Sequence, residues 1–161
     1  MVQIAGGRVL GDTTVEMVTA DPGIFTLGPL GGIGTAAAIN QDGTINGPTN
    51  PAIAGQVIQI FGTGQGFVSG APPDGSAPSG PLQSSRPPTV LIGPEVVTGS
   101  GITYAGLAPG EVGVWQVNVT IPRDIITLPT NPTYLVIIQD SNPSGSPATG
   151  RAVQIYVKQP S

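Results

Sequence analysis

The side chains that could support acid–base or nucleophilic chemistry in this chain of 161 residues are almost all carboxylates. The chain has no histidine and no cysteine, so the commonest general base and the thiol nucleophile are both missing. A glycosidase needs two carboxylates that face each other across the substrate, and no spacing here indicates such a pair. We therefore predict that the chain is not an enzyme and that most of its carboxylates are solvated turn residues. They are Asp12, Glu16, Asp21, Asp42, Asp74, Glu95, Glu111, Asp124 and Asp140.

Two other segments look like ligand loops. Residues 62–66 (GTGQG) follow a predicted strand, but a phosphate-binding loop needs a helix after it and the sequence here continues as FVSG. We interpret this segment as a strand end where glycines let two backbones approach closely. Residues 40–46 (NQDGTIN) are rich in oxygen atoms, as a calcium loop is, but they contain one carboxylate and no closing acidic residue follows. We predict a tight hairpin, because Asp42 and Gly43 can both take positive φ, and neither a metal nor a cofactor.

Charge is scarce in this chain. Only 9% of the residues are charged, against roughly a quarter in an average soluble domain, and the net charge is −4. The cations are scattered singly, so no basic stripe is available for nucleic acid and no polybasic cluster for a membrane surface. No apolar run is long enough to span a bilayer. We expect neither nucleic-acid binding nor direct membrane insertion. The cations are Arg8, Arg86, Arg123, Arg151 and Lys158.

The elements that must position these groups are short strands. Val, Ile and Thr recur throughout, and prolines interrupt almost every stretch of the chain, so no window is free of helix breakers for long enough to form a good helix. In residues 113–121 every second residue is apolar, which predicts one buried face and one face toward water or a partner. The phase of Trp115 places it in the core rather than on an exposed sugar-binding platform. The predicted core comprises Phe25, Ile58, Ile60, Trp115, Val117 and Val119, together with Val153 and Ile155.

Residues 69–88 form a long segment rich in Pro, Gly and Ser without hydrophobic periodicity. We interpret it as an excursion within one domain, because neither side of it holds enough strands for an independent sandwich. The predicted architecture is all-β, a sandwich with this one long loop.

Several short motifs occur in a fixed order along nearly the whole chain. They are DPGIFT at 21–26, AINQDGTIN at 38–46, NPA at 50–52, IFGTGQG at 60–66, VLIG at 90–93, YAGLAPG at 104–110 and WQVNVTIP at 115–122. Together they resemble the uncharacterised carboxy-terminal domain family found in many copies in large secreted acidobacterial (Solibacter-type) proteins, which is similar to the IPT/TIG immunoglobulin-like modules. The resemblance implies an immunoglobulin-like β-sandwich in a secreted or cell-surface protein. It implies no catalytic residues and no cofactor.

The two ends of the chain have similar patterns. Residues 2–18 and 135–157 each contain two apolar runs around a turn, as if the chain began with the end of one repeat and finished with the end of the next. We therefore divide it into an N-terminal hairpin, residues 1–20, and a sandwich domain, residues 21–161. The hairpin is either the remnant of a preceding repeat or a donor that completes a neighbouring subunit, because an isolated two-stranded hairpin is only marginally stable. In the second case the assembly residues are Val2, Ile4, Val15 and Met17.

Two functions follow as hypotheses. The first is a non-catalytic, extracellular structural or cohesive module that contacts itself or neighbouring immunoglobulin-like domains, as a spacer in an array or as a self-assembling subunit of a surface filament. The second is an adhesin module whose 69–88 loop binds a surface glycan or protein.

Overall fold

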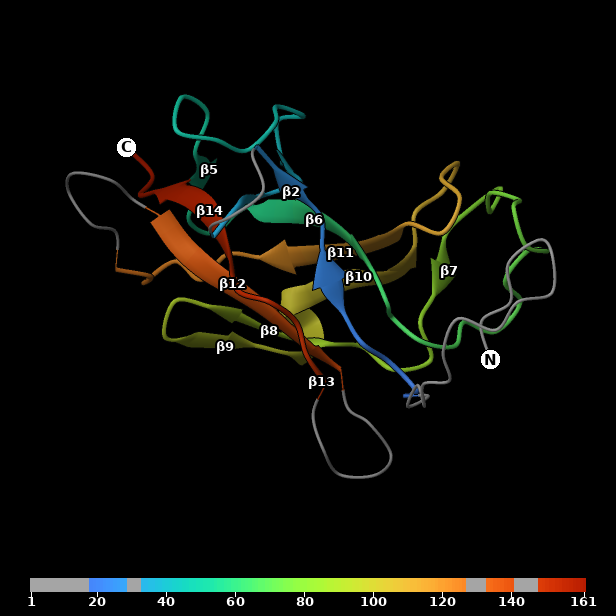
Figure 1. Cartoon of the computed structure of the whole chain (residues 1–161). Coiled ribbons are helices and arrows are strands. Elements are labelled where there is room, and N and C mark those ends of the chain that lie inside the picture. Colours follow the sequence, from blue (N-terminus) through green and yellow to red (C-terminus); the bar gives the residue numbers. More distant parts are fainter. Residues whose placement is uncertain (1–17, 29–32, 127–132, 141–147) are drawn as a thin grey trace, which may run out of the picture.

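The computed structural model describes residues 18–28, 33–126, 133–140 and 148–161, which form two packed β-sheets (Figure 1). The all-β prediction is confirmed: within these residues the helical structure is one short 3₁₀ turn, η1 (Gly99–Gly101). The predicted assembly residues Val2, Ile4, Val15 and Met17 lie outside the described residues.

The first sheet has six strands and is built around two long central ones. The strands are β1 (Gly23–Ile24), β4 (Ala38–Asn40), β6 (Val57–Thr63), β7 (Leu82–Gln83), β10 (Ile102–Leu107) and β11 (Trp115–Thr120). Their order is β1-β6-β11-β10-β7, and β4 also pairs with β6. All of these pairs are antiparallel.

The second sheet has eight strands and contains the end of the chain. The strands are β2 (Thr26–Leu27), β3 (Thr35–Ala36), β5 (Ala52–Ile53), β8 (Thr89–Ile92), β9 (Glu95–Val97), β12 (Thr133–Asp140), β13 (Ala148–Thr149) and β14 (Val153–Lys158). Their order is β2-β3-β14-β12-β8-β9, with β13 on β12 and β5 on β14. β3 and β5 both run parallel to β14, next to different parts of it.

The strand order is that of an immunoglobulin-like sandwich. When β4, β6, β8, β10, β11, β12 and β14 are lettered A to G in chain order, the first sheet reads A-B-E-D and the second G-F-C. These are the two sheets of the seven-stranded immunoglobulin arrangement. The additional strands extend the edges of this frame.

The core lies between the inner faces of the two sheets. Along β6 and β11 buried and half-buried residues alternate strictly, which is the pattern expected of strands with one face inside. Most of the residues predicted for the core are buried there: Ile58, Ile60, Trp115, Val117, Val119, Val153 and Ile155.

Phe25 corrects the core prediction, because its side chain is 42% exposed. It follows β1 directly, and the preceding residue, Ile24, packs against the core. Successive side chains of an extended chain point to opposite faces, so Phe25 points outward. The prediction was correct that this apolar segment packs on the core, but it chose the wrong one of two neighbouring side chains.

The hairpin predicted over residues 40–46 is present, with a three-residue loop. The Gly43 N–H donates to the Asn40 carbonyl (2.9 Å), and the Asn40 N–H donates to the Thr44 carbonyl (2.8 Å). Gly43 has φ +83°, whereas no non-glycine residue in the described part of the chain has positive φ, so Asp42 does not use the left-handed conformation that was open to it. The Asp42 carboxylate instead accepts bonds from the Thr44 N–H (3.0 Å) and hydroxyl (2.7 Å). Hydrogen bonds from the Asp42 side chain thus stabilise the turn, and a second residue with positive φ is not needed.

Asn46 joins this hairpin to the last strand. Its side-chain carbonyl accepts the Tyr156 N–H (2.8 Å), and its amide donates to the Tyr156 carbonyl (2.9 Å) and to Asn40 Oδ1 (2.9 Å). On the same edge of β14, β3 pairs at Gln154 and β5 pairs from Val157 onward. Between β3 and β5, the Asn46 side chain therefore makes the hydrogen bonds to β14 that the backbone of a strand residue would otherwise make.

Asn46→Ala should lower the free energy of unfolding by about 2–3 kcal/mol, because it leaves the Tyr156 backbone groups without this partner in a buried setting. Asn50→Ala is the matched control: Asn50 is exposed and contributes its backbone carbonyl to Asn40, which alanine retains. Urea titrations followed by circular dichroism give both values. Equal losses in the two variants would contradict the role assigned to Asn46.

Trp115→Ala should cost about 3–5 kcal/mol, because the ring is 2% exposed and its removal leaves a large cavity between the sheets. Val112→Ala, at a 54% exposed position just before β11, should leave stability within about 0.5 kcal/mol. Trp115 is the one tryptophan of the chain, so unfolding must be followed by circular dichroism rather than by fluorescence. An unchanged melting temperature for Trp115→Ala would show that the ring is not a core residue in solution.

Candidate assembly surface

The glycine-rich segment at the end of β6 serves as a backbone docking strip. A Cβ added to Gly62, Gly64 or Gly66 would overlap a carbonyl oxygen of residues 19–23. The Asp21 N–H donates to the Gly64 carbonyl (2.9 Å), so the two segments are bonded as well as close. The sequence interpretation of 62–66 as a strand end with closely approaching backbones is confirmed, and no helix follows it.

The docking strip is where the beginning of the described chain first contacts the sandwich. Residues 19–22 run beside it and lead directly into β1, while Val18 is 51% exposed. The described chain therefore begins beside the end of β6, beyond its last paired residue, Thr63. The point of attachment is thus held in place by main-chain contacts.

Three backbones meet where β1 continues into β2. The Phe25 N–H donates to the Phe61 carbonyl (3.0 Å), the Phe61 N–H donates to the Ala37 carbonyl (3.0 Å), and the Ala37 N–H donates to the Phe25 carbonyl (2.7 Å). On either side of this ring of hydrogen bonds the chain changes sheets, from β1 to β2 and from β3 to β4. We call it the sheet junction.

An apolar patch lies on the outer side of the sheet junction. Phe25 is 42%, Leu27 45% and Ile33 54% exposed. Leu27 is paired with Thr35 in the β2–β3 ladder, two residues from Phe25 on one segment and two residues from Ile33 on the other. We call these three residues the β2 patch. No charged residue occurs between Pro22 and Gln41, so the patch has no charge of its own.

The outer face of the six-stranded sheet continues this uncharged surface. Half-buried Gln59, Gln116 and Asn118 project from β6 and β11, and the Gln116 side-chain amide donates to Asn118 Oδ1 (2.8 Å). At its border the Tyr104 hydroxyl bonds the Leu82 backbone, and burial raises the pKa of that hydroxyl. The face offers amides and rings, so it can hydrogen-bond and pack but is insensitive to salt.

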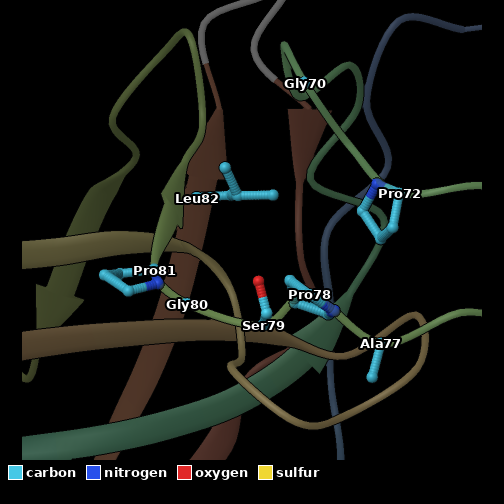
Figure 2. Close-up of a pocket in the computed structure, with 8 residues that line it drawn as sticks. All are labelled: Gly70, Pro72, Ala77, Pro78, Ser79, Gly80, Pro81 and Leu82. Carbon is cyan, nitrogen blue, oxygen red and sulfur yellow. The ribbon is translucent and has the colours of Figure 1, made fainter.

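The 69–88 loop leaves β6 and returns to the same sandwich. Within it, β7 pairs with β10, which the sequence reading did not anticipate; the Ser84 N–H donates to the Ala105 carbonyl (2.8 Å), and the Pro78 carbonyl accepts the Gly110 N–H (2.9 Å). The loop surrounds a pocket of about 340 Å³ (Figure 2). Its lining consists of Gly70, Pro72, Ala77, Pro78, Ser79, Gly80, Pro81 and Leu82. Serine supplies the one side-chain hydroxyl, so the pocket has little with which to orient a sugar.

The carboxylates do not gather at one place. Among the described residues no group of three or more Asp or Glu side chains could hold a metal ion. Asp42, at the tip of its hairpin, has a pKa below its ordinary value because the Thr44 hydroxyl and N–H stabilise the charged form. Asp12 and Glu16 lie outside the described residues. In the described part of the chain, then, the exposed apolar and amide surfaces are more prominent than any constellation of reactive groups.

No family model, no curated protein and no solved structure matches this chain. In the described residues, no helix is long and apolar enough to cross a membrane.

Gly64→Ala tests the docking strip. Gly64 and Gly75 both have φ +80°, but a Cβ at Gly75 would meet open space. Gly75→Ala should therefore cost about 1–2 kcal/mol from backbone strain alone. Gly64→Ala should cost a further ~1–3 kcal/mol, because residues 19–23 must move away from β6. Denaturant unfolding measures both losses, and the docking strip is refuted by a Gly64→Ala loss no larger than that of the control.

Proposed function

We propose that this chain is a non-catalytic, extracellular structural or cohesive module that associates with further copies or with neighbouring immunoglobulin-like domains. In the most specific form of the proposal it is a self-assembling subunit of a surface filament whose donor lies within residues 1–20, in the part before residues 19–20, which pack on the chain's own β6. The observation that carries the proposal is the β2 patch, an exposed apolar surface on an uncharged sheet edge.

An apolar edge of this kind is a liability in a monomer. Proteins normally protect sheet edges with charges, prolines or bulges, since unpaired backbone groups invite pairing with another chain. Here Phe25 and Leu27 are exposed beside such groups without a nearby charge. Association with another module would cover both the side chains and the edge.

The low charge of the whole chain supports the same proposal. A chain with only 9% charged residues and many amides has little long-range repulsion between copies, so close packing of like modules costs little electrostatic energy. The resemblance of its ordered motifs to domains of large secreted proteins supports the extracellular setting. The adhesin hypothesis is supported by the pocket within the 69–88 loop, but that pocket is lined mainly by Gly, Pro and Ala.

Deletion of residues 1–17 tests the proposal. All of the core residues of the described sandwich, from Ala20 to Val157, lie after residue 17, so the shortened chain retains them. We expect the full-length chain to form concentration-dependent oligomers, visible by light scattering and as rods by electron microscopy. The shortened chain should remain monomeric with a similar melting temperature.

Two outcomes would contradict this. Equal assembly of both chains would show that the N-terminal segment is not the donor. A full-length chain that stays monomeric at every concentration, yet binds a glycan on an array through residues 71–85, would favour the adhesin hypothesis.

A further inference from the structure

The sheet edges of the sandwich differ in how open they are to an added strand. The outer side of β4 is covered by its own hairpin, since the Asn46 N–H donates to the Ala38 carbonyl (2.9 Å) and Ile39 is bridged to Ile45. The outer side of β14 is occupied by β3, the Asn46 side chain and β5. Neither edge has room for another chain.

Two further edges carry the usual protection. β7 is two residues long, follows Pro81 and uses the backbone of Leu82 to bond the Tyr104 hydroxyl. β9 follows Pro94 and begins with Glu95, although Val96 is 64% exposed. Proline and charge at an edge discourage pairing with a second chain.

Within the described residues, the edge from Gly23 to Leu27 differs from these two in its side chains: Pro22 precedes it as well, but it has no charged residue and exposes both Phe25 and Leu27. Phe25 turns both its N–H and its C=O inward, to Phe61 and Ala37. Because neighbouring residues of an antiparallel strand direct their backbone groups to opposite sides, those of Ile24 and Thr26 point toward the open edge. The chain from Gly23 to Leu27 thus combines outward hydrogen-bonding groups with an apolar patch.

We propose that this β2 edge is the acceptor for residues 1–17 of a second copy, which add to it as a further strand; this inference rests on the proposed function. The donor segment alternates apolar and polar residues around Val2 and Ile4 and again around Val15 and Met17. Such a strand can pair through its backbone while its apolar side chains cover Phe25, Leu27 and Ile33.

The position of the two partners makes the contact head-to-tail. Residues 1–17 join at Val18, beyond the docking strip, whereas Leu27 lies at the opposite end of the same edge. A donor that leaves at one end of the edge and an acceptor at the other form a heterologous contact, which propagates as an open filament unless the rotation between copies closes a ring. The described sandwich is already closed at β14, so the donor extends an edge rather than filling a gap in the core.

A mixing experiment tests the acceptor separately from the donor. The chain without residues 1–17 keeps the acceptor, and full-length Leu27→Lys keeps the donor but places a charge in the patch. Each should be monomeric alone, and no oligomer should form in either sample at a concentration about tenfold above that at which the wild type assembles. Full-length Val96→Lys, with its charge on the opposite edge of the same sheet, should assemble as the wild type does.

Neither variant should polymerise, whether alone or mixed with the other, whereas every sample that contains wild type should form filaments. The chain without residues 1–17 should cap wild-type filaments and shorten them, because it accepts a donor and offers none. Leu27→Lys should cap them from the other end. Ile33→Lys provides a second patch variant, and circular dichroism checks that each variant remains folded.

The outcomes separate the two proposals. Normal assembly of both Leu27→Lys and Ile33→Lys, with loss of assembly on deletion of 1–17, would overturn the β2 acceptor but leave the donor segment. Normal assembly after the deletion would overturn the donor segment itself. Equal loss of assembly in Val96→Lys would show that any added edge charge is disruptive and would also overturn the assignment to β2.

Discussion

The sheet junction is the constraint on which the rest of this sandwich depends. Phe61 uses its N–H for Ala37 and its C=O for Phe25, so one residue of β6 holds two passing segments. Each of these segments belongs to both sheets, and the junction therefore ties the sheets together at this edge. The same bonds determine that Ile24 faces the core and that Phe25 faces outward. The exposed β2 patch is a geometric consequence of the way in which the sandwich is closed.

In this chain, close contacts between backbones hold together segments that charged side chains would join in more highly charged proteins. The glycines of the docking strip allow residues 19–23 to lie directly on the end of β6, and Gly106 allows the β7 backbone to approach β10 in the same way. Amide side chains supply the remaining connections, above all Asn46 with Tyr156. Backbone and amide bonds carry no net charge, so this kind of cohesion does not depend on ionic strength. Such a scaffold suits an exposed setting whose salt and pH vary.

The sheet edges of the sandwich differ in how well they are protected, and this difference favours assembly at one particular edge. Proline at β7, proline and a glutamate at β9, a returning hairpin at β4, and β3, β5 and the Asn46 side chain at β14 cover or protect those edges, whereas the β2 edge has exposed phenylalanine and leucine. Unequal edges favour one mode of contact over many, which is what a regular polymer requires and what random aggregation lacks. A donor attached at one end of that edge gives such a contact a polarity.

The sequence by itself determined the all-β class, the alternation along β6 and β11, the hairpin at residues 40–46 and the close backbone approach at 62–66, because periodicity and glycine placement are local properties. It did not determine which way Phe25 faces, since alternation gives the period of a strand but not its phase relative to a core that another strand defines. It also could not show that Asn46 completes the edge of β14, because its partner Tyr156 lies 110 residues further along the chain. The two-residue β7 was hidden in a proline-rich segment for the same reason: its pairing depends on β10, not on its own composition. Only the tertiary structure decided these features, because each depends on a backbone group brought from a distant part of the chain.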